Sequence, residues 1–379
     1  MLKTKFEEDI MRTNENVRHC EQCGAEIHGE DFTEFDGKVL CPSCLNRETL
    51  ICAHCGERIR RDDNAGNSYV ALCRYCRDEY YTTCERCECI IHNDMAHYIG
   101  DYPYCDDCYD REKEHSIHDY SYKPDPIFYG NGKRFFGVEL EIDDGGKDDD
   151  NADILLDIAN SGDERIYIKC DGSLDDGMEI VTHPMTLDYH KNEMPWEDVM
   201  HEAILLGYKS HKSGTCGLHI HVNRETFGNT REAQDDAISR VLYFVEHHWN
   251  ELLRFSRRTE SQMNQWAARY GYKNNPKDIL DHAKKEEKGR YTCVNITNWN
   301  TVEFRMFRGT LKYNTLIATL ELVNRICNLA VHCDDVRLAN ITWSDFVMSL
   351  NESDCAELIT YLKERRLYVN APVEREEDE

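Results

Sequence analysis

The chain lacks any long apolar run. Its hydrophobic stretches, such as AILL at 203–206, fall far short of the roughly 20 residues that a membrane-spanning helix needs. The first twenty residues also lack the apolar segment of a secretory signal, so we expect a cytoplasmic chain in a reducing compartment. We therefore expect neither a membrane contact nor disulfide bonds.

An excess of basic side chains is missing as well. The 379 residues contain 72 acidic and 45 basic side chains, a formal net charge of −27. Residues 1–120 follow the same trend, with 26 Asp and Glu against 14 Lys and Arg. Such a charge disfavours binding to the phosphate backbone of nucleic acids. A Walker P-loop is absent too, because GNGK at 130–133 has the wrong spacing.

Cysteine, in contrast, is abundant: the chain has 19, and 13 of them precede residue 109. Twelve of these form Cys-x-x-Cys pairs in three units. Within each unit the second pair begins 21 residues after the first, and each unit begins 32 residues after the previous one. This is an internal repeat. The pairs are Cys20/Cys23 with Cys41/Cys44, Cys52/Cys55 with Cys73/Cys76, and Cys84/Cys87 with Cys105/Cys108.

Two Cys-x-x-Cys turns supply the four thiolates of a tetrahedral zinc site. Units of this length cannot bury enough apolar surface to fold alone, so we expect three structural Zn²⁺ ions to stabilise them. The segments EFDGKVLC and YIGDYPYC predict short strands before the second pair, as in zinc-ribbon or LIM-like modules. Spacing alone leaves open whether a neighbouring side chain replaces a ligand in the third unit; the candidates are Cys89, His19, His28, His92 and His97.

The rest of the chain predicts an α+β domain. A segment with two prolines and two glycines, 119–133, marks the linker before it. Apolar residues at helical spacing predict helices at 196–207, 230–258 with Thr230 as its cap, 277–288, 311–332 and 344–366. The expected organisation is an N-terminal segment (1–18), a zinc array (19–118), the linker (119–133), a core (134–332), C-terminal helices (333–366) and an acidic disordered tail (367–379).

Four predicted strands each carry acidic, histidine or arginine side chains on one face and apolar side chains on the other. Their sequences are FGVELEI, MEIVTHP, CGLHIHV and TVEFRMF. For any single strand, a half-buried strand with a wet outer face is the better explanation of this alternation. Together the polar positions favour a site for Mg²⁺ or Mn²⁺ with an anion-binding arginine. These positions are Glu139, Glu141, Glu179, His219, His221, Glu303 and Arg305.

These segments, with DGSL before the second of them, resemble the amidoligase family of carboxylate–amine ligases, which is related to glutamine synthetase and glutamate–cysteine ligase. The resemblance covers about residues 134–312. It implies an antiparallel sheet that forms a funnel, with ATP and divalent ions on its polar face. Three zinc units are not part of the core ligase pattern.

The resemblance also implies roles for individual residues. The cofactor-binding positions would be Glu139, Glu141, Glu179, His219 and Glu303. Arg305 and Arg308 would neutralise the transferred phosphate, with His221 on the substrate side. Weaker substrate-side candidates are Asp171, Arg290 and Asn295. The polar stretch 257–292 reads equally well as a lid and as a surface connection.

The expected function is ATP- and Mg²⁺-dependent formation of an amide bond, peptide or isopeptide, through an acyl-phosphate intermediate. The zinc array would recruit a peptide or protein substrate, or a protein partner. Two alternatives remain open at this point. One is a non-catalytic zinc-finger adaptor with a degenerate ligase-like domain, and the other is a metal-dependent hydrolase or nuclease.

Overall fold

The computed structural model describes residues 17–29, 31–99, 101–285 and 289–368. Contacts within the chain divide it into two compact units, Met1–Asp110 and Arg111–Glu379. Most of the expected N-terminal segment, 1–18, and of the expected acidic tail, 367–379, lies outside the described residues. Each unit is described below by itself.

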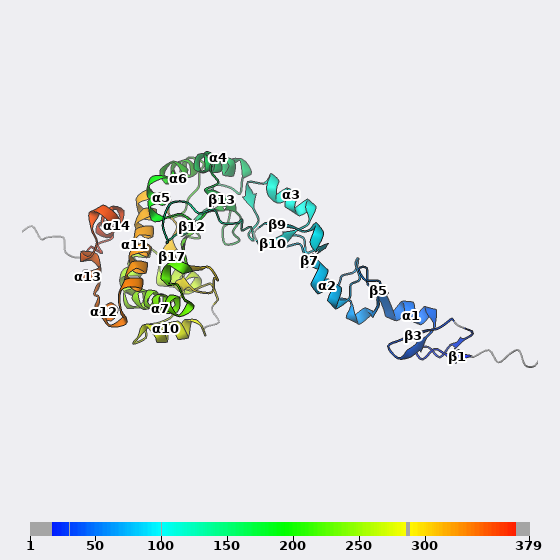
Figure 1. Ribbon diagram of the computed structural model, residues 1–379. Helices are drawn as coiled ribbons and strands as arrows, with labels where there is room; N and C mark the ends of the chain where they lie inside the picture. The colour runs from blue at the N-terminus through cyan, green and yellow to red at the C-terminus, as the bar shows by residue number, and fades with distance from the viewer. Residues whose placement is uncertain (1–16, 30, 100, 286–288, 369–379) are drawn as a thin grey trace, which may run out of the picture. The chain divides into compact units, whose positions relative to one another are not determined.

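The first unit contains three small modules, each with paired two- or three-residue strands and one short helix (Figure 1). The first has β1 (Arg18–His19), β2 (Glu26–Ile27), β3 (Thr33–Phe35), β4 (Lys38–Leu40) and α1 (Pro42–Glu48). The second has β5 (Thr49–Ile51), β6 (Arg58–Arg60), the 3₁₀ turn η1 (Arg61–Asp63) and α2 (Arg74–Tyr80). The third has β7 (Tyr81–Thr83), β8 (Ile90–His92), η2 (Asn93–Met95), β9 (His97–Ile99), β10 (Tyr102–Tyr104) and α3 (Asp106–Glu114).

The strands predicted before the second cysteine pair form in two of the three modules. EFDGKVLC contains most of the antiparallel pair β3–β4, and YIGDYPYC contains most of the pair β9–β10. The second module, which is described throughout, has a loop at this place instead. Asn64 Oδ1 accepts hydrogen bonds from the backbone N–H groups of Gly66 and Leu72, both at 3.0 Å, and these bonds shape the loop.

The repeat extends to the junctions between modules. Arg61 of the second module donates from Nε to the carbonyl oxygen of Arg47, at 2.6 Å, near the end of α1. Asn93 of the third module donates from Nδ2 to the carbonyl oxygen of Glu79, at 3.1 Å, near the end of α2. Donors and acceptors are both 32 residues apart. The second and third modules therefore each satisfy carbonyl groups that the preceding helix leaves free at its C-terminus.

The second unit contains a seven-stranded sheet with the strand order β11-β13-β14-β12-β15-β17-β16. The strands are β11 (Ile117–His118), β12 (Phe136–Ile142), β13 (Ile166–Lys169), β14 (Met178–Thr182), β15 (Gly217–Asn223), β16 (Val294–Asn295) and β17 (Thr301–Arg308). All neighbours are antiparallel except β11 and β13, which run parallel. The sheet is therefore mixed, and the prediction of an antiparallel sheet is wrong at this edge.

The residues expected to link the zinc array to the core take part in the second unit. β11 lies within the segment expected to belong to the array. Farther along, the backbone N–H of Ile127 donates to His183 Nδ1 at 3.2 Å, and Tyr129 donates from its hydroxyl to the carbonyl oxygen of Glu164 at 2.9 Å. This segment runs along the domain that follows it.

A helix lies at each of the five predicted places in the second unit, but the lengths differ, and the helices at 149–160, 187–192, 260–266 and 335–340 were not predicted. The expected helix 230–258 is interrupted at His248, where φ is −105° and ψ is 31°, and the expected helix 344–366 is also divided. Thr230 does cap the first of these pieces, because its side chain accepts from the backbone N–H of Ala233. The helices are α4 (Asp149–Asn160), α5 (Leu187–Asn192), α6 (Trp196–Leu205), α7 (Arg231–His247), α8 (Trp249–Ser256), α9 (Glu260–Trp266), α10 (Pro276–Ala283), α11 (Tyr313–His332), α12 (Asp335–Asn340), α13 (Trp343–Met348) and α14 (Glu352–Glu364), with the 3₁₀ turn η3 (Arg224–Phe227).

One apolar core joins the sheet to these helices. Val138, Leu140 and Ile142 of the central strand β12 are fully buried in it. The long helix α11 packs against α5, α7 and α14 (Figure 1). The C-terminal helices α12–α14 thus share the core of the sheet. The apolar face of the sheet supports its polar face from behind.

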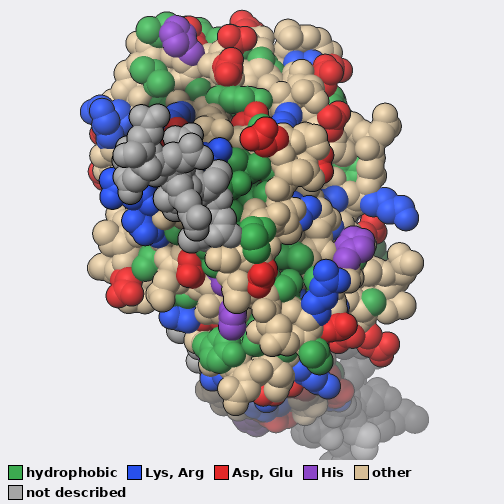
Figure 2. Space-filling model, turned by 90° about the vertical axis from the view of Figure 1, so that its left-hand side faces the viewer, with side chains coloured by type: hydrophobic (Ala, Val, Ile, Leu, Met, Phe, Trp, Pro, Cys, Tyr) green, Lys and Arg blue, Asp and Glu red, His purple; other side chains and the backbone are tan. Residues whose placement is uncertain are grey.

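Acidic and basic side chains are interspersed on the face of the molecule drawn in Figure 2, with hydrophobic side chains between them. None of the described helices is long and apolar enough to cross a bilayer.

Candidate functional site

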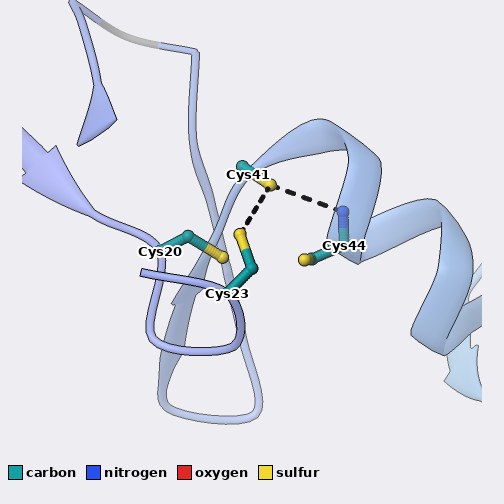
Figure 3. A group of neighbouring side chains, drawn as sticks. All are labelled: Cys20, Cys23, Cys41 and Cys44. Carbon is teal, nitrogen blue, oxygen red and sulfur yellow. Dashed lines mark hydrogen bonds between the residues drawn. The ribbon is translucent and has the colours of Figure 1, made fainter. Parts of the chain in front are cut away.

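The predicted cysteine quartets assemble in all three modules. Four sulfurs bound at ~2.3 Å to one tetrahedral ion would lie about 3.8 Å apart. The Sγ atoms of Cys23 and Cys41 are 3.8 Å apart, and Figure 3 shows the four side chains of this first site pointing toward one another. Cys41 Sγ also accepts from the backbone N–H of Cys44 at 3.5 Å. Such N–H···S bonds favour the thiolate form that binds metal.

The other two quartets repeat this geometry. The Sγ atoms of Cys55 and Cys73 are 4.0 Å apart, and those of Cys87 and Cys105 are 3.7 Å apart. In each module the first and last cysteines of the quartet are buried. All three sites have the donor set and the spacing of structural zinc sites, so the residues fit the ion.

The alternative ligands of the third module do not belong to its quartet, which consists of Cys84, Cys87, Cys105 and Cys108. His97 instead lies 2.7 Å from the Asp106 carboxylate, and His92 Nδ1 accepts from the backbone N–H of Asp94 at 3.2 Å. Cys89 packs in the small cluster around the quartet.

The sheet of the second unit brings the polar residues of its four central strands together. Residues that pair across strands share a face, so each pairing places two side chains next to each other. Glu139 pairs with His219, Glu141 pairs with Glu179, and His221 pairs with Glu303. The predicted alternation of polar and apolar residues is therefore correct on all four strands.

This polar face is buried. Glu179 is 2% exposed and Glu303 is 3% exposed, while Glu141 and His219 are also buried. A wet outer face would leave such side chains in solvent. Buried carboxylates need cationic or hydrogen-bonding partners. The burial therefore rules out the interpretation that these polar side chains form an ordinary solvent-exposed face of the sheet.

Glu139 lies at the centre of the cluster. Its Oε2 is 3.3 Å from His219 Nδ1, and its Oε1 is 3.1 Å from His221 Nε2. Two groups with ligand atoms close enough to hold a metal ion share this residue: Glu139, Glu179 and His219, and Glu139, His221 and Glu303. Glu141 adds a carboxylate oxygen 3.8 Å from His219 Nε2.

Charge within the cluster is unevenly distributed. Burial, reinforced by the charge of Glu139, raises the pKa of Glu179 well above its ordinary value. Burial opposes the charged form of Glu139 too, but the charge of His221 and hydrogen bonds from both histidines hold its pKa well below the ordinary value. A divalent cation beside both carboxylates would offset the repulsion between their negative charges. The donor set, carboxylate oxygens with imidazole nitrogen, fits Mg²⁺ or Mn²⁺.

Glu303 and His221 are fixed in orientation by their neighbours. Asn295 and Asn298 donate from Nδ2 to Glu303 Oε2 at 2.8 and 3.1 Å. Arg305 forms an ion pair with the other oxygen of Glu303. Nδ1 of His221 is 3.1 Å from Thr301 Oγ1, which directs Nε2 toward Glu139. Such supporting contacts are typical of metal ligands.

Of the three weaker candidates, only Asn295 belongs to the polar cluster. Asp171 accepts from the backbone N–H of Ser173 at 2.7 Å and so closes its own turn. Arg290 donates to the hydroxyl group of Tyr120 and lies over its ring.

Two residues near the polar face were not predicted. Lys169 on β13 lies 3.1 Å from Glu179 Oε2 and balances part of its charge. Arg258, just after α8, donates from Nε to the carbonyl oxygen of Phe307 at 3.2 Å. The alternation within β13 could have indicated Lys169, whereas Arg258 lies in a turn and follows no pattern in the sequence.

Comparison with protein-family models found no match to this chain, and a search of curated protein sequences found none either.

Proposed function

We propose that the second unit is an ATP- and Mg²⁺-dependent carboxylate–amine ligase of the amidoligase type, and that the zinc array recruits its peptide or protein substrate. One observation carries this proposal. Two partly buried groups of side chains that could hold a metal ion share Glu139, and Arg305 forms an ion pair with Glu303 of the second group. Magnesium sites that bind nucleotides combine carboxylates in this way with cationic side chains.

The residues divide into three roles in this proposal. Glu139, Glu141, Glu179, His219 and Glu303 would hold Mg²⁺ or Mn²⁺. Arg305 and Arg308 would bind phosphoryl oxygens, and His221, held by Thr301, would face the substrate. ATP supplies the phosphoryl group that turns a carboxylate oxygen into a leaving group. The buried polar face would keep water away from the activated carboxyl group.

Hydroxylamine trapping tests the proposal without knowledge of the natural amine. A panel of carboxylic acids, amino acids and peptides is incubated with the full chain, Mg²⁺, ATP and hydroxylamine. We expect ATP-dependent hydroxamate formation with at least one carboxylate. Glu303→Gln and Arg305→Gln should abolish it, while Glu232→Gln on the exposed surface of α7 should retain it.

Two outcomes favour the alternatives. Metal-dependent cleavage of phosphodiesters without ATP would indicate a hydrolase or nuclease. A folded chain that holds three zinc ions but binds neither Mg²⁺ nor nucleotide would indicate an adaptor.

A further inference from the structure

Four arginines gather where β17 ends, beside the polar face. Arg305 and Arg308 belong to β17, whereas Arg257 and Arg258 form the turn after α8. The Arg257 guanidinium donates to the carbonyl oxygens of Arg308 and Gly309 at 3.1 and 3.2 Å. Together with the bond from Arg258 to Phe307, these contacts fix the turn against the end of the strand. Arg257, Arg258, Arg305 and Arg308 are named here the arginine cluster.

A β-bulge turns Arg308 toward the polar face. Ile220 pairs with Phe304, but Leu218 pairs with Phe307, so β17 has one extra residue between these two pairs. In a regular strand, alternation from Arg305 would bring Phe307 to the polar face. Because of the extra residue, Arg308 pairs with Gly217 instead and shares its face.

Gly217 shows how closely Arg258 approaches the proposed metal ligands. A β-carbon at this position would lie 2.7 Å from His219 Nε2, 2.8 Å from an Arg258 guanidinium nitrogen and 3.3 Å from Glu141 Oε2. The three side chains therefore surround one point, and only glycine leaves it free. Gly137 on the neighbouring strand differs, since a β-carbon there would meet only the β-carbon of His221, at 3.5 Å.

Two members of the arginine cluster, Arg258 and Arg308, have no carboxylate partner within the described residues. Arg305 forms an ion pair with Glu303, but its Nε is buried without a hydrogen-bond acceptor. Half-buried guanidinium groups without a carboxylate partner favour an anionic ligand.

We propose that Arg258, together with Arg305 and Arg308, binds a phosphoryl group at the Gly217 edge of the polar face. The flat guanidinium fork matches the oxygens of a phosphoryl group, which are spaced for paired N–H···O bonds. Arg257 is a positioning residue, because its guanidinium donates to the backbone of β17. The inference rests on the proposed function only for the identity of the phosphoryl donor, ATP.

The test is calorimetric titration of the full zinc-loaded chain with inorganic pyrophosphate, without Mg²⁺ or nucleotide. We expect Arg258→Gln to weaken pyrophosphate binding about ten-fold or more, as expected for the loss of a charge-assisted hydrogen bond. Arg258→Lys should recover only part of the affinity, because it keeps the charge without the fork. Arg254→Gln, at an exposed position of α8, is the matched control and should bind like the original chain.

A second pair of variants covers the case in which Arg258→Gln does not fold. Gly217→Ala should weaken pyrophosphate binding, because its methyl group occupies the point that the three side chains surround, whereas Gly137→Ala should not. The inference is overturned if the original chain binds no pyrophosphate, or if Arg258→Gln and Arg254→Gln bind it equally. It is also overturned if acetate at equal ionic strength displaces pyrophosphate as well as inorganic phosphate does.

Pyrophosphate titration and hydroxylamine trapping together separate this inference from the proposed function. Pyrophosphate binding that depends on Arg258, without hydroxamate formation, would retain the anion site and reject the ligase. Hydroxamate formation that is unchanged in Arg258→Gln would retain the ligase and reject the role of Arg258.

Discussion

The two units of the chain organise their candidate metal-binding side chains in opposite ways. In the zinc array, the cysteines are themselves part of the buried centre: among the described residues of the first module, the buried core cluster consists of Cys20, Ile27, Leu40, Cys44 and Leu45. In the second unit, an extensive apolar core lies on one face of the sheet and the glutamates and histidines lie on the other. The candidate metal ligands are therefore part of the core in one unit, whereas in the other an apolar core lies behind the candidate site.

Removal of zinc should cause the largest difference in folding between the two units. Structural zinc contributes on the order of 10–16 kcal/mol to the folding of finger-sized modules. We expect a strong chelator to unfold the array and to leave the second unit folded. Hydrogen exchange resolved by peptide mass spectrometry measures both at once. Loss of protection in β12 and β15 together with the array would show that the second unit also depends on zinc.

Truncation of the apolar core should destabilise the second unit and leave the zinc array intact. Leu140→Ala removes a fully buried side chain from β12 and should cost about 2–5 kcal/mol of unfolding free energy in the second unit. Leu205→Ala, at a residue of α6 that is 65% exposed, is the control and should change the unfolding free energy by less than about 0.5 kcal/mol. Urea unfolding measures both, and three bound zinc ions per chain should remain in each variant.

The hydrogen bonds between modules allow the two junctions of the array to be compared. Arg61→Ala removes the hydrogen bonds to the end of α1 and should destabilise that junction by about 1–2 kcal/mol. Asn93→Ala removes one neutral bond at the equivalent junction and should cost about 0.5–1.5 kcal/mol. Exchange rates of amides near the ends of α1 and α2 report the two effects separately. Equal exchange in the variants and the original chain would mean that the modules do not stabilise one another.

The smallest expected effect concerns one turn of the repeat. Gly24, Gly56 and Glu88 occupy equivalent positions after the first Cys-x-x-Cys pair, and all have positive φ, at 73°, 75° and 59°. A left-handed conformation costs a non-glycine residue about 1–2 kcal/mol. Glu88→Gly should therefore stabilise the third module by about 1 kcal/mol, measured as slower zinc transfer from this site to a competing chelator. Gly56→Ala is the matched control, and it should accelerate transfer from the second module.

The sequence predicted the cysteine quartets and the polar face of the sheet because their positions follow simple periods. A spacing of 32 residues identified all twelve cysteines, and alternation along strands identified the polar face from Glu139 to Arg305. Both patterns are local, and each depends only on the geometry of one turn or one strand.

Features that depend on contacts distant in sequence were not predictable. Phe307 and Arg308 exchange faces because of a bulge that only the pairing with β15 reveals. β11 joins the sheet as a parallel edge strand although its two residues have no strand pattern of their own. Arg258 reaches the polar face because Arg257 adopts a left-handed conformation, with φ of 63°, at the end of α8.

The central claim is that the polar face of the sheet is a nucleotide–metal site supported by a core that does not depend on it. The most direct measurement is calorimetric titration of ATP into the zinc-loaded chain, with and without Mg²⁺, beside the double variant Glu139→Gln, Glu303→Gln. We expect Mg²⁺-dependent binding in the original chain and no binding in the variant, with equal zinc content and a folded second unit in both. Equal binding in the two proteins, or no binding in either, would contradict it.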